Sequence, residues 1–241
     1  MQKVAIIGAG ISGLSMAHLL KDRYEVKLFE KESTPGGLIR CKQVNGSLFH
    51  VCGGHVFNSK FQDVLDWFWK FFDQNKEFVK TDRNSVVFME DGKHIPYPIE
   101  NHAYFFDEDT QKAIINDLLN INKTGYNGQD AKDFEDFLQQ RFGKTLYNLY
   151  FKPYNTKVWR RDLSTVPLKW LKDKLPMPTV EEILFNNFNH IEEMKFVHSR
   201  FWYEKHGGSQ FIIDRLSQGL NITCNADIKE IKSENSHWIV N

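Results

Sequence analysis

The stretch KVAIIGAGISGLSMAHLL, Lys3 to Leu20, decides the fold. It opens with a short continuous apolar run of the kind that a buried parallel strand shows. The glycine turn GAGISG follows at once, and the residues after it have apolar side chains at helical spacing. A second strand is expected at Glu25–Phe29, and it ends in Glu30. A strand, a glycine turn, a helix, a second strand and an acid in this order predict a dinucleotide-binding unit.

Each residue type in the turn has its own physical reason. Gly8 permits the tight turn, Gly10 lets the backbone approach a pyrophosphate, and Gly13 lets the helix pack closely on the strand. The helix begins around Ser12, where free N–H groups and a partial positive charge favour phosphate. Glu30 is placed to bind ribose hydroxyls, which disfavours NADP because of its ribose 2′-phosphate.

The composition excludes several classes of protein. The chain has 241 residues with 41% hydrophobic residues, enough for one large domain or two modest ones. Lys+Arg 31 and Asp+Glu 31 balance, so the net charge gives no argument for nucleic acid or for an anionic membrane. The three cysteines share no C-x-x-C spacing, which indicates reduced thiols and neither a disulfide framework nor a metal site. Neither a signal-cleavage site nor a membrane span is recognisable, so we expect a cytoplasmic protein.

A second glycine doublet follows the acid, in the segment Thr34–Leu38, TPGGL. The segment resembles the FAD-binding branch that includes amine oxidases, protoporphyrinogen oxidases and UDP-galactopyranose mutases. In those families the backbone of the doublet lies near the phosphates and ribityl chain of the flavin. The resemblance favours FAD over NAD. It implies cofactor contacts along the loop, from Lys31, Gly36, Gly37 and Leu38, although Leu38 stands where arginine is usual.

The run VCGGHVFNSK, Val51–Lys60, narrows the resemblance to the UDP-galactopyranose mutases. These enzymes carry a Gly-Pro-His or Gly-Gly-His segment with the histidine next to the isoalloxazine ring. The resemblance implies that Gly54 leaves room for the flavin and that His55 is the catalytic candidate. A histidine satisfied within the core is the structural alternative. Bacterial mutases commonly have a second histidine three positions later, where this chain has Asn58.

A second informative run is LYFKPYNTKVWRRDLSTVP, residues 149–167, in which aromatic and cationic residues are interleaved. Such a mixture suits nucleic acid or a nucleoside diphosphate, and an ordinary helix end with solvated charges is the alternative. The segment resembles the mutase region that binds the uridine and diphosphate, which favours a nucleotide sugar over nucleic acid. The resemblance implies these substrate-binding residues: Tyr154, Lys157, Trp159, Arg160 and, in place of a diphosphate-binding arginine, Lys174.

The end of the sequence returns to the flavin branch. Phe201–Ser209 resembles its Phe-x-Tyr-Pro-x-x-Gly-Gly segment, which implies a substrate contact for Tyr203. Ala226–Ile231 resembles the strand whose backbone, near Ile228, holds the adenine. The final strand, His237–Val240, is expected to lack a partner. Because no Gly-Asp dipeptide occurs here, while the family has one late in its sequence, we expect a C-terminally incomplete chain.

These patterns predict an α/β protein with a Rossmann-like FAD-binding domain and an inserted, mainly helical second lobe. The expected ranges are 1–60 for the first part of the FAD-binding domain, 61–205 for the lobe and 206–241 for the return segment. Within the lobe we expect an aromatic helix at Lys60–Asp73, a hairpin of Ser85–Met89 and Lys93–Tyr97, and helices at Asp109–Ile121 and Asp133–Arg141.

The leading functional hypothesis is an FAD-dependent UDP-galactopyranose mutase-like enzyme of cell-surface polysaccharide synthesis. By resemblance, reduced flavin attacks the anomeric carbon of the sugar and displaces UDP. One alternative is an oxidoreductase of the amine or protoporphyrinogen oxidase type, because Asn58 and Lys174 replace mutase-associated residues. The other is a truncated, non-catalytic nucleotide-binding fragment. The sequence leaves open whether the chain forms a homodimer.

Overall fold

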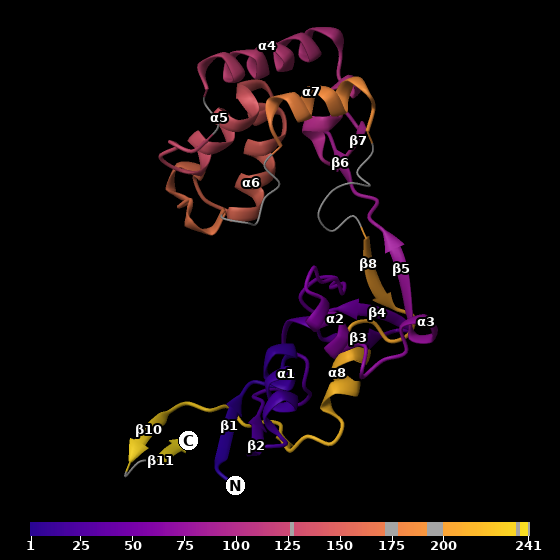
Figure 1. Cartoon of the computed structure of the whole chain (residues 1–241), viewed down its shortest axis with the longest axis vertical. Coiled ribbons are helices and arrows are strands. Elements are labelled where there is room, and N and C mark those ends of the chain that lie inside the picture. Colours follow the sequence, from indigo (N-terminus) through magenta and orange to yellow (C-terminus); the bar gives the residue numbers. More distant parts are fainter. Residues whose placement is uncertain (126–127, 172–177, 192–199, 235–236, 241) are drawn as a thin grey trace. The chain divides into compact units, whose positions relative to one another are not determined.

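The computed structural model describes residues 1–125, 128–171, 178–191, 200–234 and 237–240. The chain divides into two compact units, and the second is inserted into the sequence of the first. Unit 1 consists of Met1–Thr81 and Arg200–Asn241, and unit 2 of Asp82–Ser199 (Figure 1). The boundaries thus fall after residues 81 and 199, whereas the sequence placed them after residues 60 and 205.

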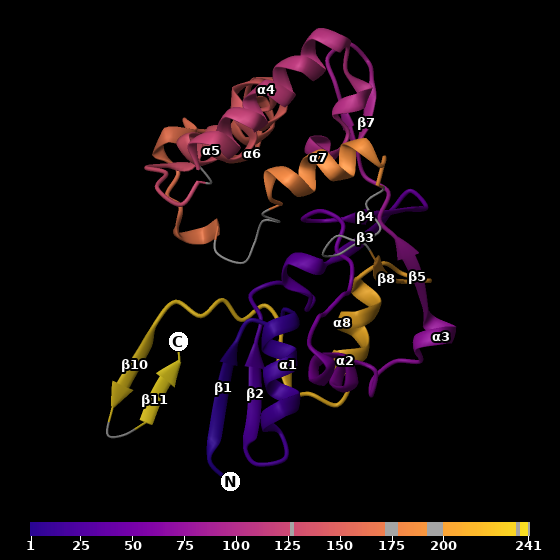
Figure 2. The same cartoon turned by 45° about the horizontal axis from the view of Figure 1, so that its top comes forward.

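A three-stranded parallel sheet carries the glycine turn in unit 1. Strands β1 (Lys3–Ile7), β2 (Glu25–Phe29) and β9 (Ile222–Thr223) form it, with β2 in the middle. Helix α1 (Ile11–Leu20) joins β1 to β2 and lies beside them (Figure 2). The predicted order of strand, turn, helix and strand is therefore confirmed. Leu14 and Ala17 of α1 are fully buried, as Leu28 of β2 is.

Residues 61–81 belong to unit 1 because their aromatic side chains pack into its core. Phe68, Phe72 and Phe78 are buried in one cluster with Leu14 of α1 and Ile213 of α8 (Gln210–Ser217). Helix α2 (Gln62–Phe68) ends earlier than expected, and the chain turns there. Phe68 and Phe72 then stack with ring centroids 4.6 Å apart. Strand β5 (Phe78–Asp82) pairs with β8 (Arg200–Glu204), which brings the two chain crossings between the units together.

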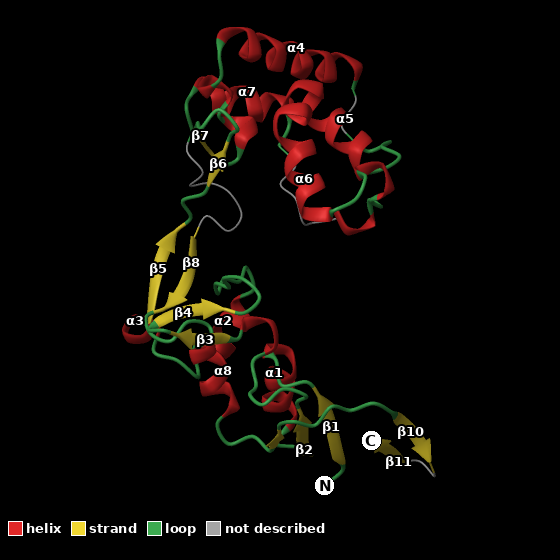
Figure 3. Ribbon diagram, turned by 180° about the vertical axis from the view of Figure 1, so that it is seen from behind, coloured by secondary structure: helices red, strands yellow, loops and turns green. Residues whose placement is uncertain are grey.

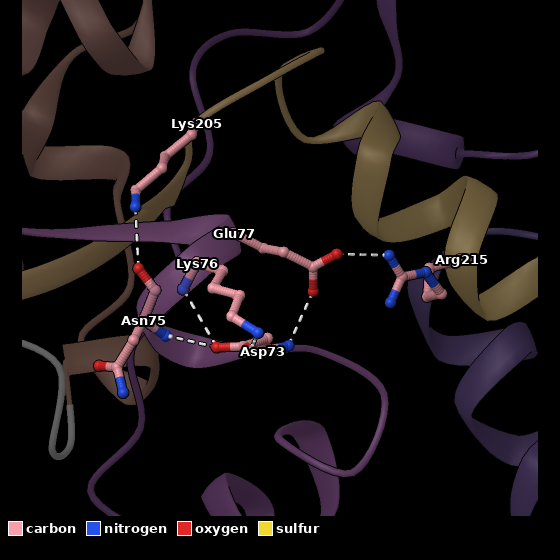
Figure 4. Close-up of polar contacts among 6 residues, drawn as sticks. All are labelled: Asp73, Asn75, Lys76, Glu77, Lys205 and Arg215. Carbon is pink, nitrogen blue, oxygen red and sulfur yellow. Dashed lines mark hydrogen bonds and ion pairs between the residues drawn. The ribbon is translucent and has the colours of Figure 1, made fainter.

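A polar clamp joins three segments of unit 1 around the short helix α3 (Gln74–Glu77) (Figure 4). The Asp73 carboxylate caps α3 by accepting from two backbone N–H groups of its first turn. The Glu77 carboxylate accepts from the Arg215 guanidinium of α8 at 2.6 Å, and Arg215 also donates to the Phe71 carbonyl at 2.7 Å. Lys205, after β8, donates to the Asn75 carbonyl at 2.8 Å. The clamp therefore ties α8 and the end of β8 to α3.

Two hairpins complete unit 1. Strands β3 (Cys41–Val44) and β4 (Ser47–His50) form the first, and β10 (Ile231–Glu234) and β11 (His237–Val240) form the second. The last strand therefore has a partner within the chain. The strand expected at 226–231 is wrong, because only Ile231 lies in a strand. The backbone there is satisfied otherwise: the Ala226 N–H donates to the Glu30 carbonyl at 2.8 Å.

Unit 2 is mainly helical, as expected (Figure 3). Its longer helices are α4 (Glu108–Thr124), α5 (Phe134–Leu146) and α7 (Val180–Phe188). Each begins at a side chain that accepts from a first-turn N–H group: Asp107 for α4, Asp133 for α5 and Thr179 for α7. The predicted hairpin is present as β6 and β7, paired antiparallel. The core of unit 2 contains the buried side chains of Phe134, Leu138 and Ile183. The other bounds are β6 (Val86–Phe88), β7 (His94–Pro96) and α6 (Lys152–Trp159).

Candidate functional site

The structure brings the two glycine-rich segments of the first forty residues together. The Gly36 N–H donates to the Ala9 carbonyl at 3.0 Å. A Cβ placed on Gly37 would lie 3.1 Å from the Gly10 Cα, so the doublet packs directly on the first glycine turn. A Cβ on Gly13 would lie only 2.0 Å from the Gly8 carbonyl oxygen. This close approach of helix to strand is the one that the sequence predicts for Gly13.

The N-terminus of α1 is open to a ligand. Gly10 caps the helix without a side-chain hydrogen bond, and the first turn contains no acidic residue. Ile11 and Ser12 are exposed. The first N–H groups of a helix have no partner within the helix and carry a partial positive charge. This end of α1 is therefore suited to bind an anion such as a pyrophosphate.

Glu30, which the sequence predicts to bind a ribose, also fixes the glycine turn through a hydrogen bond. It is only 5% exposed, and its carboxylate accepts from the Ala9 N–H at 2.7 Å and from the Glu32 N–H at 3.0 Å. Each carboxylate oxygen has two lone pairs, so a ribose hydroxyl can share the same oxygens. The segment of Ile228, which is half-buried, starts beside Glu30, and Lys31 next to the acid is exposed.

His55 has a ring nitrogen that lacks a protein partner. Its Nε2 is buried and makes no hydrogen bond among the described residues, while its carbonyl accepts from the Ser209 hydroxyl at 3.2 Å. Gly54 is exposed, and a Cβ built on it would have no neighbour within 4 Å. The predicted contact of this loop with a flavin stays a prediction. An orphaned imidazole nitrogen nevertheless fits a site that is completed by a ligand.

Three further residues of unit 1 follow the glycine doublet or belong to the His55 loop. Leu38 is 70% exposed on a short turn after the doublet. Arg40 makes an ion pair with Glu32 at 3.1 Å, and its buried Nε has no hydrogen-bond partner in the described part of the chain. The amide of Asn58, which replaces the second histidine, donates to the Arg200 carbonyl at 2.8 Å and so ties the loop to β8.

Tyr203 takes part in a chain of side chains that the sequence analysis missed. Its hydroxyl shares a hydrogen bond with His50 Nε2 at 2.9 Å, and His50 Nδ1 lies 3.4 Å from Cys41 Sγ. Burial, with the neighbouring Glu204 carboxyl, raises the pKa of Tyr203. The three residues come from β8, β4 and β3. Their spacing along the chain gave no signal, because only the pairing of β3 with β4 brings Cys41 opposite His50.

Unit 2 contains a cavity of about 1450 Å³ that two of the predicted substrate residues line, Tyr154 and Lys157. Trp159 is partly buried and packs against the core of unit 2, with its ring centroid 5.0 Å from that of Trp170, and Trp170 lines the cavity. Arg160 is exposed directly after α6. Lys174 lies outside the described residues. Tyr203 belongs to unit 1.

The sequence analysis missed the polar residues on the inner side of this cavity. Tyr150 is 8% exposed and stacks on Tyr154 with ring centroids 5.2 Å apart. The Arg83 guanidinium lies 4.7 Å from the centre of the Tyr97 ring. Glu100 is 6% exposed, and its burial raises the pKa of its carboxyl to about 7. A single acid at the end of the apolar run IPYPI, residues 95–99, was the available signal for Glu100.

The described part of the chain shows neither a metal-binding group nor a membrane-spanning helix. Its histidine, cysteine and acidic side chains form no group that could hold a metal ion. None of its helices combines the length and the apolar character that crossing a membrane requires.

Comparison with known proteins agrees with this architecture. The model of the NAD(P)-binding Rossmann-like domain matches residues 6–74. A probable UDP-galactopyranose mutase of Klebsiella pneumoniae is 29% identical over 186 residues, which are 73% of this chain and 45% of that protein. A dTDP-fucopyranose mutase of Escherichia coli is 25% identical over 184 residues, or 73% of this chain and 46% of that protein. The chain spans less than half the length of these two relatives.

A crystal structure of reduced UDP-galactopyranose mutase superposes on both units of the chain. The TM-score is 0.81 with 27% identity, over 95% of this chain and 50% of that structure. By sequence and by fold, this chain is therefore a UDP-galactopyranose mutase-like protein with a Rossmann-like nucleotide-binding region.

Proposed function

We propose that this chain forms part of an FAD-dependent UDP-sugar mutase, an isomerase that makes galactofuranose units for cell-surface polysaccharide of the lipopolysaccharide type. The observation that carries the proposal is the combination of two sites in one chain. Unit 1 has an open helix N-terminus beside two packed glycine segments, and unit 2 has an aromatic cavity with basic residues. The similarity to UDP-galactopyranose mutases over both units supports the same assignment.

The residues of unit 1 fit an FAD dinucleotide. The N-terminus of α1 would bind the pyrophosphate beside the packed backbones of Gly10 and Gly37, and Glu30 would accept from ribose hydroxyls. His55 would direct its partnerless Nε2 to the flavin and so fix the ring orientation. When bound in its reduced form, FAD supplies a nucleophile for the anomeric carbon of the sugar.

The residues of unit 2 would hold the nucleotide sugar. Tyr154 is half exposed at the cavity and stacks on the buried Tyr150, so its ring is held in place for stacking on a base. Lys157 supplies positive charge on the same helix for the diphosphate, and Arg160 follows that helix. Trp159 supports the cavity through its contact with Trp170.

Two measurements test the proposal. First, the chain is mixed with FAD and passed over a gel-filtration column, and visible flavin absorbance should travel with the protein. Second, a version extended to the length of the relatives is reduced with dithionite and given UDP-galactopyranose, and the sugar nucleotides are separated by HPLC. Formation of UDP-galactofuranose is expected. A flavin-loaded, reduced preparation that makes no furanose would refute the mutase function.

The same preparation separates the alternatives. An oxidoreductase of the amine or protoporphyrinogen oxidase type would have its flavin bleached by an amine or a porphyrinogen and restored by oxygen. The Asn58 side chain, which motivated this alternative, holds the loop to β8 in the structure and has that structural reason to be there. A non-catalytic fragment would remain colourless in the gel-filtration test.

A further inference from the structure

Glu100 is a buried carboxyl in the wall of the unit 2 cavity, and neither proposed site accounts for it. It lies in a short 3-10 turn, Ile99–Asn101, beside the apolar cluster of Ile95, Ile99 and Tyr150. Glu100 lines the cavity, and its carboxylate accepts from its own backbone N–H, while no other described side chain contributes to its titration. A buried carboxyl whose only such partner is its own backbone N–H keeps acceptor and donor capacity that a ligand or water can satisfy.

The surroundings of Glu100 favour its neutral form. Tyr150 faces it from the turn before α6, and Tyr154, Tyr97 and Arg83 act on that same tyrosine. From α7, the neutral Asn187 amide donates to the Glu100 carbonyl at 2.7 Å and fixes the turn. None of these groups is a cation in contact with the carboxyl. Desolvation therefore dominates, and it raises the pKa of Glu100 to about 7.

Arg83 is the basic lining residue near Tyr150, and the lysines of the cavity come from other parts of its lining. Lys152 and Lys157 are exposed on α6, and Lys93 is paired with Asp91 at 2.8 Å. An anionic diphosphate would find its positive partners there. The same ligand would bring two negative charges into the cavity that Glu100 lines, and a like charge disfavours ionisation of a carboxyl.

We infer that Glu100 is a specificity-determining residue of this cavity, which donates a hydrogen bond from its protonated carboxyl to a nucleotide sugar and repels the ligand once it ionises. This inference rests on the proposed function, because it takes the ligand to be a nucleoside diphosphate sugar. A carboxylic acid carries one O–H donor, and ionisation removes it. Binding of the anionic ligand is therefore linked to retention of the proton, and affinity falls as the carboxyl titrates.

The test measures binding of UDP-galactose to the chain by isothermal titration calorimetry. Both phosphates of this probe are ester-linked, so it has no phosphate monoester group that titrates near neutral pH. The dissociation constant of the unchanged chain should rise about tenfold from pH 6 to pH 8, as expected for a site that needs one proton with a pKa near 7. Glu100→Gln keeps the shape and a donor without the charge, so it should bind at both pH values about as tightly as the unchanged chain does at pH 6.

Glu90→Gln is the matched control, because Glu90 lines the same cavity but is exposed. It should keep the pH dependence of the unchanged chain. If the unchanged chain and Glu100→Gln bind UDP-galactose with the same pH profile, the role of Glu100 is refuted and the proposed function stands. If a folded Glu100→Gln loses binding at both pH values, the role as a neutral donor is likewise refuted. Failure of the unchanged chain to bind at any pH would overturn both proposals.

Discussion

Replacing Glu100 by glutamine should change how the stability of the protein depends on pH, with no ligand present. In the folded chain the pKa of this carboxyl is raised to about 7, from an ordinary value of 4.5. Between these two values the unfolded chain has lost the proton and the folded chain still holds it. Folding stability therefore falls as pH rises through this window, and it levels off once the folded carboxyl has also ionised.

The size of the effect follows from the two pKa values. A difference of about 2.5 units at 1.36 kcal/mol per unit gives a loss of about 3 kcal/mol in the free energy of unfolding, of which about 2.5 kcal/mol falls between pH 5 and pH 8. Glutamine has no charge to lose. Relative to the unchanged chain, Glu100→Gln should therefore gain about 2.5 kcal/mol on going from pH 5 to pH 8.

Equilibrium urea unfolding, followed by circular dichroism, gives the free energy of unfolding of both proteins at pH 5 and pH 8. The gain is the change between the two pH values in the stability of Glu100→Gln relative to the unchanged chain. Any constant cost of placing an amide in the buried site cancels. Glu90→Gln, which changes an exposed carboxyl at the same cavity, should show no gain above about 0.5 kcal/mol. Equal pH dependence of Glu100→Gln and the unchanged chain would contradict the burial argument, because it would mean that Glu100 ionises in the folded protein as it does in water.

Three substitutions in unit 1 have expected outcomes of their own. Gly13→Ala places a Cβ 2.0 Å from the Gly8 carbonyl, so thermal denaturation should show a clear loss of stability together with loss of FAD retention on gel filtration. Gly54→Ala meets no atom within 4 Å, so the melting temperature should be unchanged, and fluorescence titration should show weaker FAD binding if the flavin lies against this residue. Arg215→Ala removes two charge-assisted hydrogen bonds and should cost about 1–2 kcal/mol by urea unfolding. The control is Lys93→Ala in unit 2, which breaks an exposed ion pair and should leave the urea midpoint unchanged.

Local patterns in the sequence predicted the parts of the fold that local physics controls. The turn from Gly8 to Gly13 is read from glycine spacing and flanking apolar runs, and the hairpin β6–β7 from its Asp91-Gly92 turn. The family resemblance implied only that the Gly36–Gly37 doublet lies near the flavin phosphates, and its packing on Gly10 was not foreseen, because spacing alone does not say where a loop returns. Long-range packing decides such contacts.

The features that the sequence did not reveal have the same physical origin. The extent of unit 1 depends on Phe72 and Phe78 packing with α8, which follows them by well over a hundred residues. The strand expected before Ile231 rested on the family resemblance, whereas the Ala226 N–H donates to the Glu30 carbonyl after β2, a long-range contact that the local sequence does not reveal. Glu100 looks like any loop acid until Tyr150 and Ile95 close around it.

The pairing of β5 with β8 has a consequence for dissecting the protein. The chain leaves unit 1 at the end of β5 and re-enters it at the start of β8. Because these two strands are neighbours, the two ends of the insertion lie close together. Replacing residues 82–199 by a two-residue turn would join β5 to β8 as an ordinary hairpin. The shorter connection should not destabilise unit 1 through loop closure, because closure costs about 0.6 kcal/mol for each doubling of loop length. FAD affinity could then be measured on a smaller protein that lacks unit 2.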